Sequence, residues 1–146
     1  DTLIHKVADG DKICKSFLEI VQEKVEPEIL KAFTPVIKNR LWQGYPVPFI
    51  KKFSRVGQKT LNLHSDNSLL TLFIKLNDDF EGCRTVFPRQ EWSLDDVPAG
   101  TMIVFPGIIT HPHYTTELTR GIKYSLVARV TILTPRTNQF DDISNY

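Results

Sequence analysis

A histidine and an aspartate lie two residues apart in the segment LNLHSDNS, where they are His64 and Asp66. On extended backbone, residues two apart project to the same side, so both side chains can share one metal ion. A second histidine from a distant strand would complete a triad of two histidines and one carboxylate, which leaves positions open on non-haem Fe(II). His111 and His113 are both available for that place.

The types of side chain that could bind a metal limit which metal is expected. Its two cysteines, Cys14 and Cys83, are far apart and form no CxxC pair, so we expect neither a cysteine-rich zinc site nor a disulfide framework. Imidazole and carboxylate ligands together favour Fe(II), Mn(II) or Zn(II). Taken alone, the HSD triplet is also typical of a strand that ends in a polar turn, and the triplet by itself does not decide between these interpretations.

Three further motifs follow this triplet along the chain. They are the turn LNDDFEG, the run PGIITHPH, and the segment GIKYSLVARV, in which Lys123 follows His113 by ten residues. Together with HSD, they resemble the prolyl and lysyl hydroxylase branch of the Fe(II)- and 2-oxoglutarate-dependent dioxygenases. PGIITHPH and DFEGCR are most similar to the catalytic domains of procollagen lysyl hydroxylases, and the resemblance extends from about residue 26 to residue 133.

The resemblance implies a fold, a reaction and a set of site residues. The implied fold is a mainly β double-stranded β-helix, a cupin-like jelly roll, with helices at its N-terminal end. The implied reaction is hydroxylation of a peptidyl proline or lysine, with succinate and CO2 as co-products. His64, Asp66 and His113 become the catalytic metal ligands, and His111 becomes a neighbour of the site. Fe(II), 2-oxoglutarate and O2 are the implied cofactors, together with ascorbate.

Cationic side chains are needed for the C5 carboxylate of 2-oxoglutarate. The resemblance assigns this role to Lys123, which follows the second histidine at the family's spacing. Lys75 is the alternative, because it interrupts the apolar run LLTLFIKLN, where a lysine either extends outward or pairs with a buried anion. We expect Arg84, Arg120 and Arg129 at solvated surfaces, although strand alternation could turn Arg129 toward the pocket.

The chain also departs from the family's pattern. Phe53 stands where the branch commonly has a tyrosine, so a hydroxyl that could touch the cosubstrate is missing. Gly82 is followed by Cys83 where the family usually doubles the glycine, so the loop over the site can differ. Lysyl hydroxylases carry arginine at the position of Lys123, whereas several prolyl hydroxylases carry lysine, so this residue leaves the substrate type open.

The hydrophobic pattern predicts the elements that would position these residues. Apolar residues recur with helical spacing from Asp11 to about Gln22 and again after Pro27, where Pro35 should kink or divide the second helix. The expected buried faces are Ile13, Cys14, Phe17, Ile20 and Val21 in the first helix and Ile29, Leu30, Phe33, Val36, Ile37 and Leu41 in the second. The expected strands are Val47–Phe53, Lys59–Leu63, Leu69–Leu76, Arg84–Phe87, Thr101–Phe105 and Lys123–Leu133.

Length and composition are typical of one globular domain, with 146 residues, 41% of them hydrophobic. We expect a helical cover over residues 9–43, a jelly-roll core over 47–134 and a polar tail over 135–146. The 18 basic residues nearly balance the 17 acidic ones, so neither nucleic acid nor an anionic membrane is an expected partner. No apolar run reaches the roughly 18 residues of a membrane span. The sequence leaves the oligomeric state open, and the cytoplasm is favoured for this segment.

We expect the substrate to be a flexible peptide or protein segment. It would approach beside the connections Asn77–Phe87 and His111–Gly121, where Tyr114, Thr115 and Thr116 could hydrogen-bond an extended backbone. Two other classes stay open: an oxygenase that acts on a small molecule or a nucleobase, and a non-catalytic jelly roll that binds metal.

Overall fold

The chain folds into two antiparallel β-sheets and one helical segment. A computed structural model describes residues 1–32, 48–94 and 97–130. Its strands are β1 (Thr2–Leu3), β2 (Phe49–Ser54), β3 (Leu61–His64), β4 (Leu70–Lys75), β5 (Phe80–Gly82), β6 (Thr85–Phe87), β7 (Trp92–Ser93), β8 (Met102–Pro106), β9 (His113–Thr115) and β10 (Leu118–Val130). Its main helices are α1 (Gly10–Ile20) and α2 (Glu26–Ala32).

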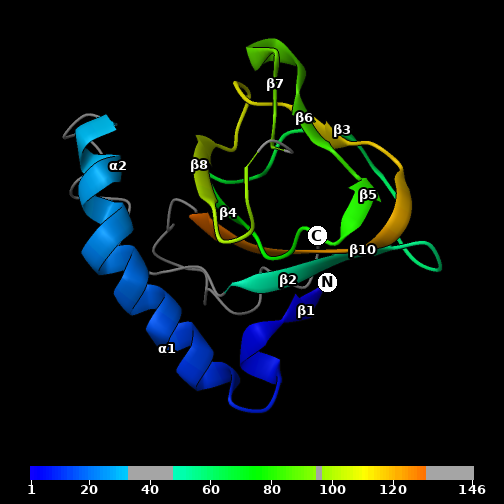
Figure 1. Cartoon of the computed structure of the whole chain (residues 1–146). Helices are drawn as coiled ribbons and strands as arrows, with labels where there is room; N and C mark the ends of the chain where they lie inside the picture. The colour runs from blue at the N-terminus through cyan, green and yellow to red at the C-terminus, as the bar shows by residue number, and fades with distance from the viewer. Residues whose placement is uncertain (33–47, 95–96, 131–146) are drawn as a thin grey trace.

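The larger sheet has the strand order β1-β2-β10-β4-β8, and β5 pairs with the first part of β10. The smaller sheet has the order β3-β9-β6-β7. Viewed end-on, the strands of both sheets surround one axis, and the helical segment lies outside them (Figure 1). The predicted mainly β fold with an N-terminal helical region is therefore confirmed.

Strand β10 presents two faces of opposite character. Leu126, Ala128 and Val130 alternate along one face and are buried in the main apolar cluster. Lys123, Ser125, Val127 and Arg129 alternate along the other face, which is polar except at Val127. The register with β4 pairs Arg129 with Thr71 and Val130 with Leu70, so each face of β10 continues on β4.

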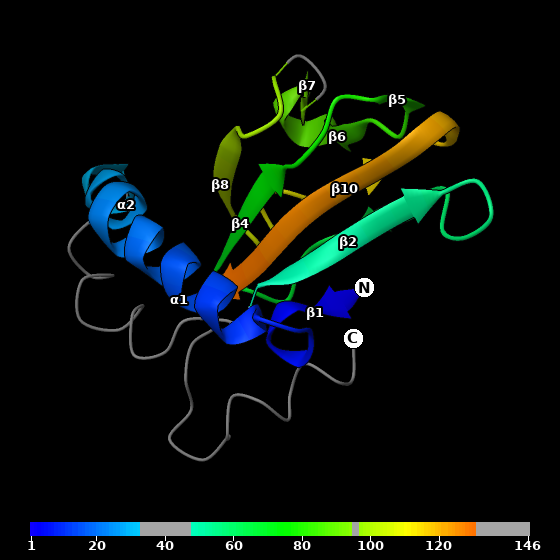
Figure 2. The ribbon, with the colours of Figure 1, turned by 60° about the horizontal axis from the view of Figure 1, so that its bottom comes forward.

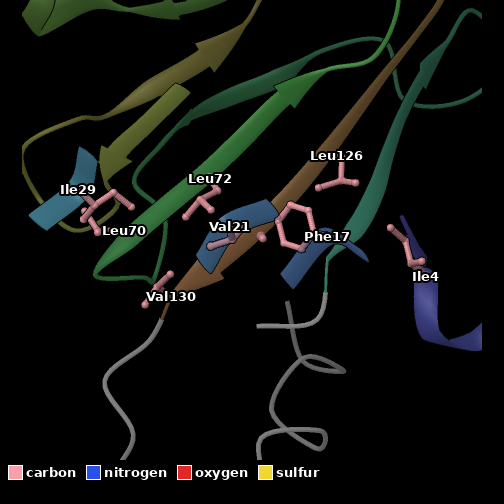
Figure 3. Packing of buried hydrophobic residues seen from close by; sticks show 9 residues of the cluster. Ile4, Phe17, Val21, Ile29, Leu70, Leu72, Leu126 and Val130 are labelled. Carbon is pink, nitrogen blue, oxygen red and sulfur yellow. The ribbon is translucent and has the colours of Figure 1, made fainter. Parts of the chain in front are cut away.

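The helical segment covers the apolar face of the larger sheet. Figure 2 shows α1 lying beside β10 and β4, and Figure 3 shows the side chains that meet there. Phe17, Val21 and Ile29 from the helical segment are buried against Leu70 and Leu72 of β4 in one cluster. In the part of the chain that the structure describes, no helix is both long and apolar enough to cross a membrane.

The two predicted helices are one continuous helical segment in the structure. A π turn, Val21–Val25, joins α1 to α2, and the N–H of Glu26 donates to the carbonyl of Val21. A proline nitrogen has no proton to donate, and the wider π turn just before Pro27 allows the helical path to continue past it. The two helices were predicted, with Pro27 in the first turn of the second one, but the helical connection between them was not.

The buried face of α1 is also narrower than predicted. Phe17 and Val21 are buried as expected, but Ile13 and Ile20 are 47% and 49% exposed. The face that meets the sheet runs through Cys14, Phe17 and Val21, at helical spacings of three and four. Ile13 and Ile20 are seven residues apart, so they share one row of the helix. This row lies next to the face that meets the sheet, and both side chains are therefore half exposed.

Short strands account for the other differences from the predicted elements. β5 and β9 lie within segments that were predicted to be connections, and β10 begins at Leu118 rather than at Lys123. β9 has three residues and follows a proline, so its own sequence contains no strand-length pattern. Several predicted positions lie outside the described residues: Phe33, Pro35, Val36, Ile37, Leu41 and Val47, the strand end at 131–133 and the tail at 135–146.

Candidate metal centre

Three side chains meet on the inner side of the smaller sheet. His64 ends β3, Asp66 follows it by two residues, and His113 begins β9, whose Cα register pairs His113 with His64. The candidate ligand atoms of the three residues all lie within 4.8 Å of one another. Nε2 of His64 is 3.8 Å from Oδ1 of Asp66, and Nε2 of His113 is 4.0 Å from Oδ2. This is the one such cluster of three or more potential ligands in residues 1–32, 48–94 and 97–130.

Both histidines have the ring orientation of a metal ligand. Nδ1 of His64 lies 2.8 Å from the carbonyl oxygen of Asn62, and Nδ1 of His113 lies 3.1 Å from that of His111. A carbonyl oxygen can only accept a hydrogen bond, so each Nδ1 carries the proton. The Nε2 atoms are then free to give a lone pair to a metal, as in many metal-binding histidines whose other ring nitrogen is held by a carbonyl.

His113 is enclosed by aromatic side chains. Its ring centroid is 5.1 Å from that of Phe87 and 5.3 Å from that of Phe105, and its side chain is 9% exposed. This burial lowers the pKa of His113, against the opposite effects of the hydrogen bond to His111 and the charge of Asp66. The imidazole is therefore held in the neutral form that binds metal without first losing a proton.

Asp66 is fixed by donors from two neighbouring strands. Nη2 of Arg129 donates to Oδ1 over 2.8 Å, and Oγ1 of Thr71 donates to Oδ2 over 2.7 Å. The hydroxyl of Ser68 lies 2.8 Å from that of Thr71 and extends the network. Gly107, from the PGIITHPH motif, makes room for this arrangement, because a Cβ there would lie 2.0 Å from Oγ of Ser68 and 3.1 Å from Cβ of Asp66.

A buried lysine lies on the inner face of β10. Lys123 is 1% exposed, and its Nζ donates to the carbonyl of Cys83 over 2.7 Å and to Oγ1 of Thr85 over 3.0 Å. Three phenylalanine rings, those of Phe53, Phe73 and Phe80, surround the ammonium at 5.5 to 5.9 Å. A desolvated cation of this kind binds a carboxylate more strongly than a surface lysine does.

Two buried polar atoms near these groups have no hydrogen-bond partner among the described residues. They are the hydroxyl oxygen of Ser125 and Nε of Arg129. Ser125 is fully buried and shares the inner face of β10 with Lys123. Buried polar groups are normally paired, so these two atoms fit a site that receives a polar ligand. Sequence reasoning missed Ser125, although its spacing of two from Lys123 on a strand was a usable signal.

Lys75 occupies a different environment from Lys123. Its Nζ is 2.6 Å from Oδ1 of Asp78 and donates to the carbonyl of Val97 over 2.9 Å. It borders an open pocket that is also lined by Asp78, Phe80, Gly82 and Arg84. The ring of Phe80 is 5.5 Å from the ammonium groups of both Lys75 and Lys123. Lys75 is thus also buried, but it already has a carboxylate partner in the protein.

His111 and Phe53 are also placed by the structure. His111 lies outside the cluster with His64 and Asp66, and its Nδ1 is 2.8 Å from the hydroxyl of Thr110. Its contribution to the cluster is its backbone carbonyl, which orients His113. Phe53 is 3% exposed and forms part of the apolar surroundings of Lys123.

The predicted surface for substrate is partly corrected. Thr115 is buried in β9 and pairs with both β3 and β6. The hydroxyl of Thr116 accepts the N–H of Arg84 over 2.8 Å. The buried hydroxyl of Thr115 is therefore not available to an extended peptide, because short-strand pairing takes up this part of the chain, whereas the partly exposed hydroxyl of Thr116 can still donate its own proton. Arg129 likewise turns inward instead of lying at a solvated surface.

Comparisons with known proteins identify relatives in sequence. The chain is 29% identical over 116 residues to procollagen-lysine,2-oxoglutarate 5-dioxygenase 2 from Homo sapiens, a match that covers 77% of the chain. It is 27% identical over 116 residues to procollagen-lysine,2-oxoglutarate 5-dioxygenase from Drosophila melanogaster, with 73% of the chain covered. The matches span only 15% and 16% of the length of these relatives. No family model matches the chain.

Solved structures give the same result for the fold. The viral collagen prolyl hydroxylase vCPH from Paramecium Bursaria Chlorella virus-1 superposes with a TM-score of 0.57 at 16% identity, covering 80% of this chain and 73% of that one. An oxidoreductase of the 2OG-Fe(II) oxygenase family from Burkholderia pseudomallei gives 0.54 at 16% identity, with coverage of 86% and 57%. The chain is thus similar in sequence to procollagen lysine hydroxylases and in fold to 2-oxoglutarate- and Fe(II)-dependent oxygenases. The suspected relation to the prolyl and lysyl hydroxylase branch is thereby confirmed, and the likeness in fold supports the predicted jelly roll.

The position of the second histidine ligand can be tested by substitution. We predict that His113→Ala weakens Mn(II) binding by at least tenfold, because it removes one of three ligands, whereas His111→Ala leaves binding within about threefold. Isothermal titration with Mn(II) measures both variants, with thermal unfolding to check that each is folded. A large loss in His111→Ala with none in His113→Ala would move the ligand to His111.

Proposed function

We propose that this chain is the catalytic part of an Fe(II)- and 2-oxoglutarate-dependent dioxygenase that hydroxylates a peptidyl proline or lysine. The observation that carries the proposal is the inward-facing set of His64, Asp66 and His113, accompanied by the buried ammonium of Lys123. A metal triad and a desolvated cation inside one fold suit a cosubstrate that has a chelating end and an anionic end.

The protein's own residues have distinct parts in this proposal. Fe(II), when bound with 2-oxoglutarate and O2, supplies the oxidative chemistry, which yields succinate, CO2 and a hydroxylated product. His64, Asp66 and His113 hold the metal, and the bonds from Thr71 and Arg129 keep the carboxylate of Asp66 in one orientation.

The distal carboxylate of 2-oxoglutarate would bind at Lys123. Thr85 already accepts a hydrogen bond from this ammonium, and the unpartnered hydroxyl of Ser125 offers a second donor from the same strand face. Phe53, in the place where the family commonly has a tyrosine, keeps the surroundings apolar, which strengthens the ion pair. No side-chain hydroxyl of residue 53 is needed when Lys123 and Ser125 are both present.

The proposed substrate follows from the relatives. Their names describe procollagen lysine and collagen proline as sites of hydroxylation. A collagen-like segment has a polyproline II backbone without internal hydrogen bonds, so it is an extended ligand of low conformational entropy. Ascorbate is included in the proposal as the reductant that keeps the iron active, as the family resemblance implies.

The reaction can be tested directly on this chain. We predict succinate formation when the protein is given Fe(II), 2-oxoglutarate, ascorbate and a proline-rich or lysine-containing peptide, with one oxygen atom added to the peptide. Asp66→Ala should abolish both products, since it removes a metal ligand, while Asp9→Ala, an exposed aspartate beside α1, should retain full activity. Succinate is measured enzymatically and the peptide by mass spectrometry.

Two results would contradict the proposed substrate or the proposed site. Efficient hydroxylation of free amino acids or nucleotides, with no peptide modified, would replace the peptide by a small molecule. Full iron-dependent turnover in Asp66→Ala would remove this triad from the reaction.

The two lysines can be separated by their effect on the cosubstrate. We predict that Lys123→Met weakens 2-oxoglutarate binding by about 2–5 kcal/mol, because a desolvated carboxylate loses its charged partner. Lys75→Met should change it by less than about threefold, since the partner of Lys75 is Asp78. Titration of the Mn(II)-loaded protein with 2-oxoglutarate gives both numbers. A loss confined to Lys75→Met would transfer the role to Lys75.

A further inference from the structure

Three large apolar side chains are exposed on the two segments that flank His113 and its aromatic neighbours. They are Trp92 of β7, which is 42% exposed, and Ile108 and Ile109 in the segment after β8, which are 46% and 71% exposed. We call these three residues the apolar rim. A group of exposed apolar side chains is typical of a surface that contacts another molecule.

Trp92 lies on the same face of the smaller sheet as the proposed metal ligands. The register of β7 with β6 pairs Trp92 with Phe87, so the two side chains share one face, and their ring centroids are 5.7 Å apart. The ring of Phe87 is in turn 5.1 Å from that of His113. Phe87 is only 2% exposed, so Trp92 is the outer member of an aromatic row that begins at His113.

The segment that carries the two isoleucines is attached beside Trp92. Nη1 of Arg89 donates to the carbonyl of Ile109, and Nε2 of Gln90 donates to that of Thr110, both over 2.9 Å. Both donors belong to the short helical turn directly before β7. These bonds hold the two parts of the apolar rim together as one surface.

Ile109 has a strained backbone in this surface. Its φ is +68°, in the left-handed region that β-branched residues rarely adopt, and its exposed side chain gains little from burial. Strain of this kind is commonly retained at positions that serve a ligand. A partner that covered Ile109 would supply the burial that the chain itself does not.

The chemistry around the apolar rim favours an uncharged, proline-rich partner. Two arginines lie beside β7, where Arg84 donates to Oγ of Ser93 over 3.1 Å and Arg89 to the carbonyl of Ile109, so a lysine-rich partner would meet like charges. Aromatic surfaces are used to bind polyproline II segments, whose extended backbone is ordered at small entropic cost.

We propose that the apolar rim is the docking surface for an uncharged, proline-rich segment of the substrate polypeptide. This inference rests on the proposed function, and it names the part of the substrate that flanks the residue to be hydroxylated. Because Phe87 joins Trp92 to His113, a segment that packs on Trp92 brings the next part of its chain close to the metal centre.

The first test measures peptide binding apart from turnover, with Mn(II) and 2-oxoglutarate bound. The chain has two tryptophans, so Trp42→Phe leaves Trp92 as the only one, and its emission reports contact with a peptide. The probes are blocked peptides of equal length: a Pro-Pro-Gly repeat, and Gly-Ser repeats that contain one proline, several lysines or several glutamates. We expect the Pro-Pro-Gly repeat to change the emission of Trp92 and to bind about tenfold more tightly than the other peptides.

The second test removes the apolar rim. We expect Trp92→Ala to weaken binding of a labelled Pro-Pro-Gly repeat about tenfold and Ile109→Asn about fivefold, measured by fluorescence anisotropy. Asparagine tolerates positive φ, so Ile109→Asn should unfold at the same temperature as the unsubstituted protein or at a higher one. Affinity for 2-oxoglutarate should stay within about twofold in both variants, because neither residue lies at Lys123.

Two further variants complete this test. Trp92→Leu keeps an apolar side chain in β7 but lacks the flat ring, and it replaces Trp92→Ala if that variant does not fold. Val56→Asn is the matched control, because Val56 is an apolar residue that is 100% exposed in the turn after β2, which both views of the ribbon place apart from β7 (Figures 1 and 2). It should bind the Pro-Pro-Gly repeat as the unsubstituted protein does.

Several results would overturn the inference, and they differ from failure of the proposed function. Hydroxylation of a peptide with unchanged binding in the Trp92 and Ile109 variants would overturn the docking surface alone. Tighter binding of the lysine or glutamate peptide would replace the proline-rich segment, and a dimer that dissociates in the variants would make this surface a contact between copies. An unsubstituted protein that hydroxylates no peptide under any of these conditions would overturn the proposed function.

Discussion

The alternation of side chains along β10 is the constraint on which the rest of this structure depends. One face of the strand supplies Leu126, Ala128 and Val130 to the core beneath the helical segment, and the other supplies Lys123, Ser125 and Arg129 to the interior. A shift of one residue in register would exchange the two faces, placing three polar groups under the helix. The apolar packing against α1 therefore fixes the positions of the polar groups on the opposite face.

The position of Arg129 on the inner face of β10 also affects the charge of Asp66. A carboxylate that is 5% exposed needs compensation, and here Arg129 and Thr71 bind its two oxygens from adjacent strands. Because one of these donors is a cation, the buried negative charge is balanced by the protein itself. The carboxylate is thus held in one orientation by the sheet, as supporting groups normally hold the ligands of a metal site.

Much of the candidate site could be predicted from the sequence, but its supporting contacts could not. Two spacings in the sequence identify the main residues: two residues from His64 to Asp66, and ten from His113 to Lys123. The structure brings His64, Asp66 and His113 together. The bonds from Thr71 and Arg129 depend on the pairing of β10 with β4, which no local pattern specifies. The alternation of the last strand indicated that Arg129 could face inward, but not which group it would meet.

The fold shows the same division between local and long-range information. The mainly β class was predictable from the sequence. So were the strongly apolar strands β4 and β10, because their patterns extend over many residues. β5 and β9 were not, since three-residue strands next to glycine or proline are defined by their partners. The π turn that joins α1 to α2 also escaped prediction, because Pro27 ordinarily indicates a helix start or break.

In the proposed function, His64, Asp66 and His113 form one metal centre next to a cosubstrate site. The most direct measurement is a crystal structure of the protein with Mn(II) and 2-oxoglutarate, in which anomalous scattering locates the metal. We expect one strong peak within bonding distance of Nε2 of both histidines and one oxygen of Asp66, with the distal carboxylate of 2-oxoglutarate at Lys123. A metal bound through His111, or a triad that stays empty at saturating Mn(II), would contradict it.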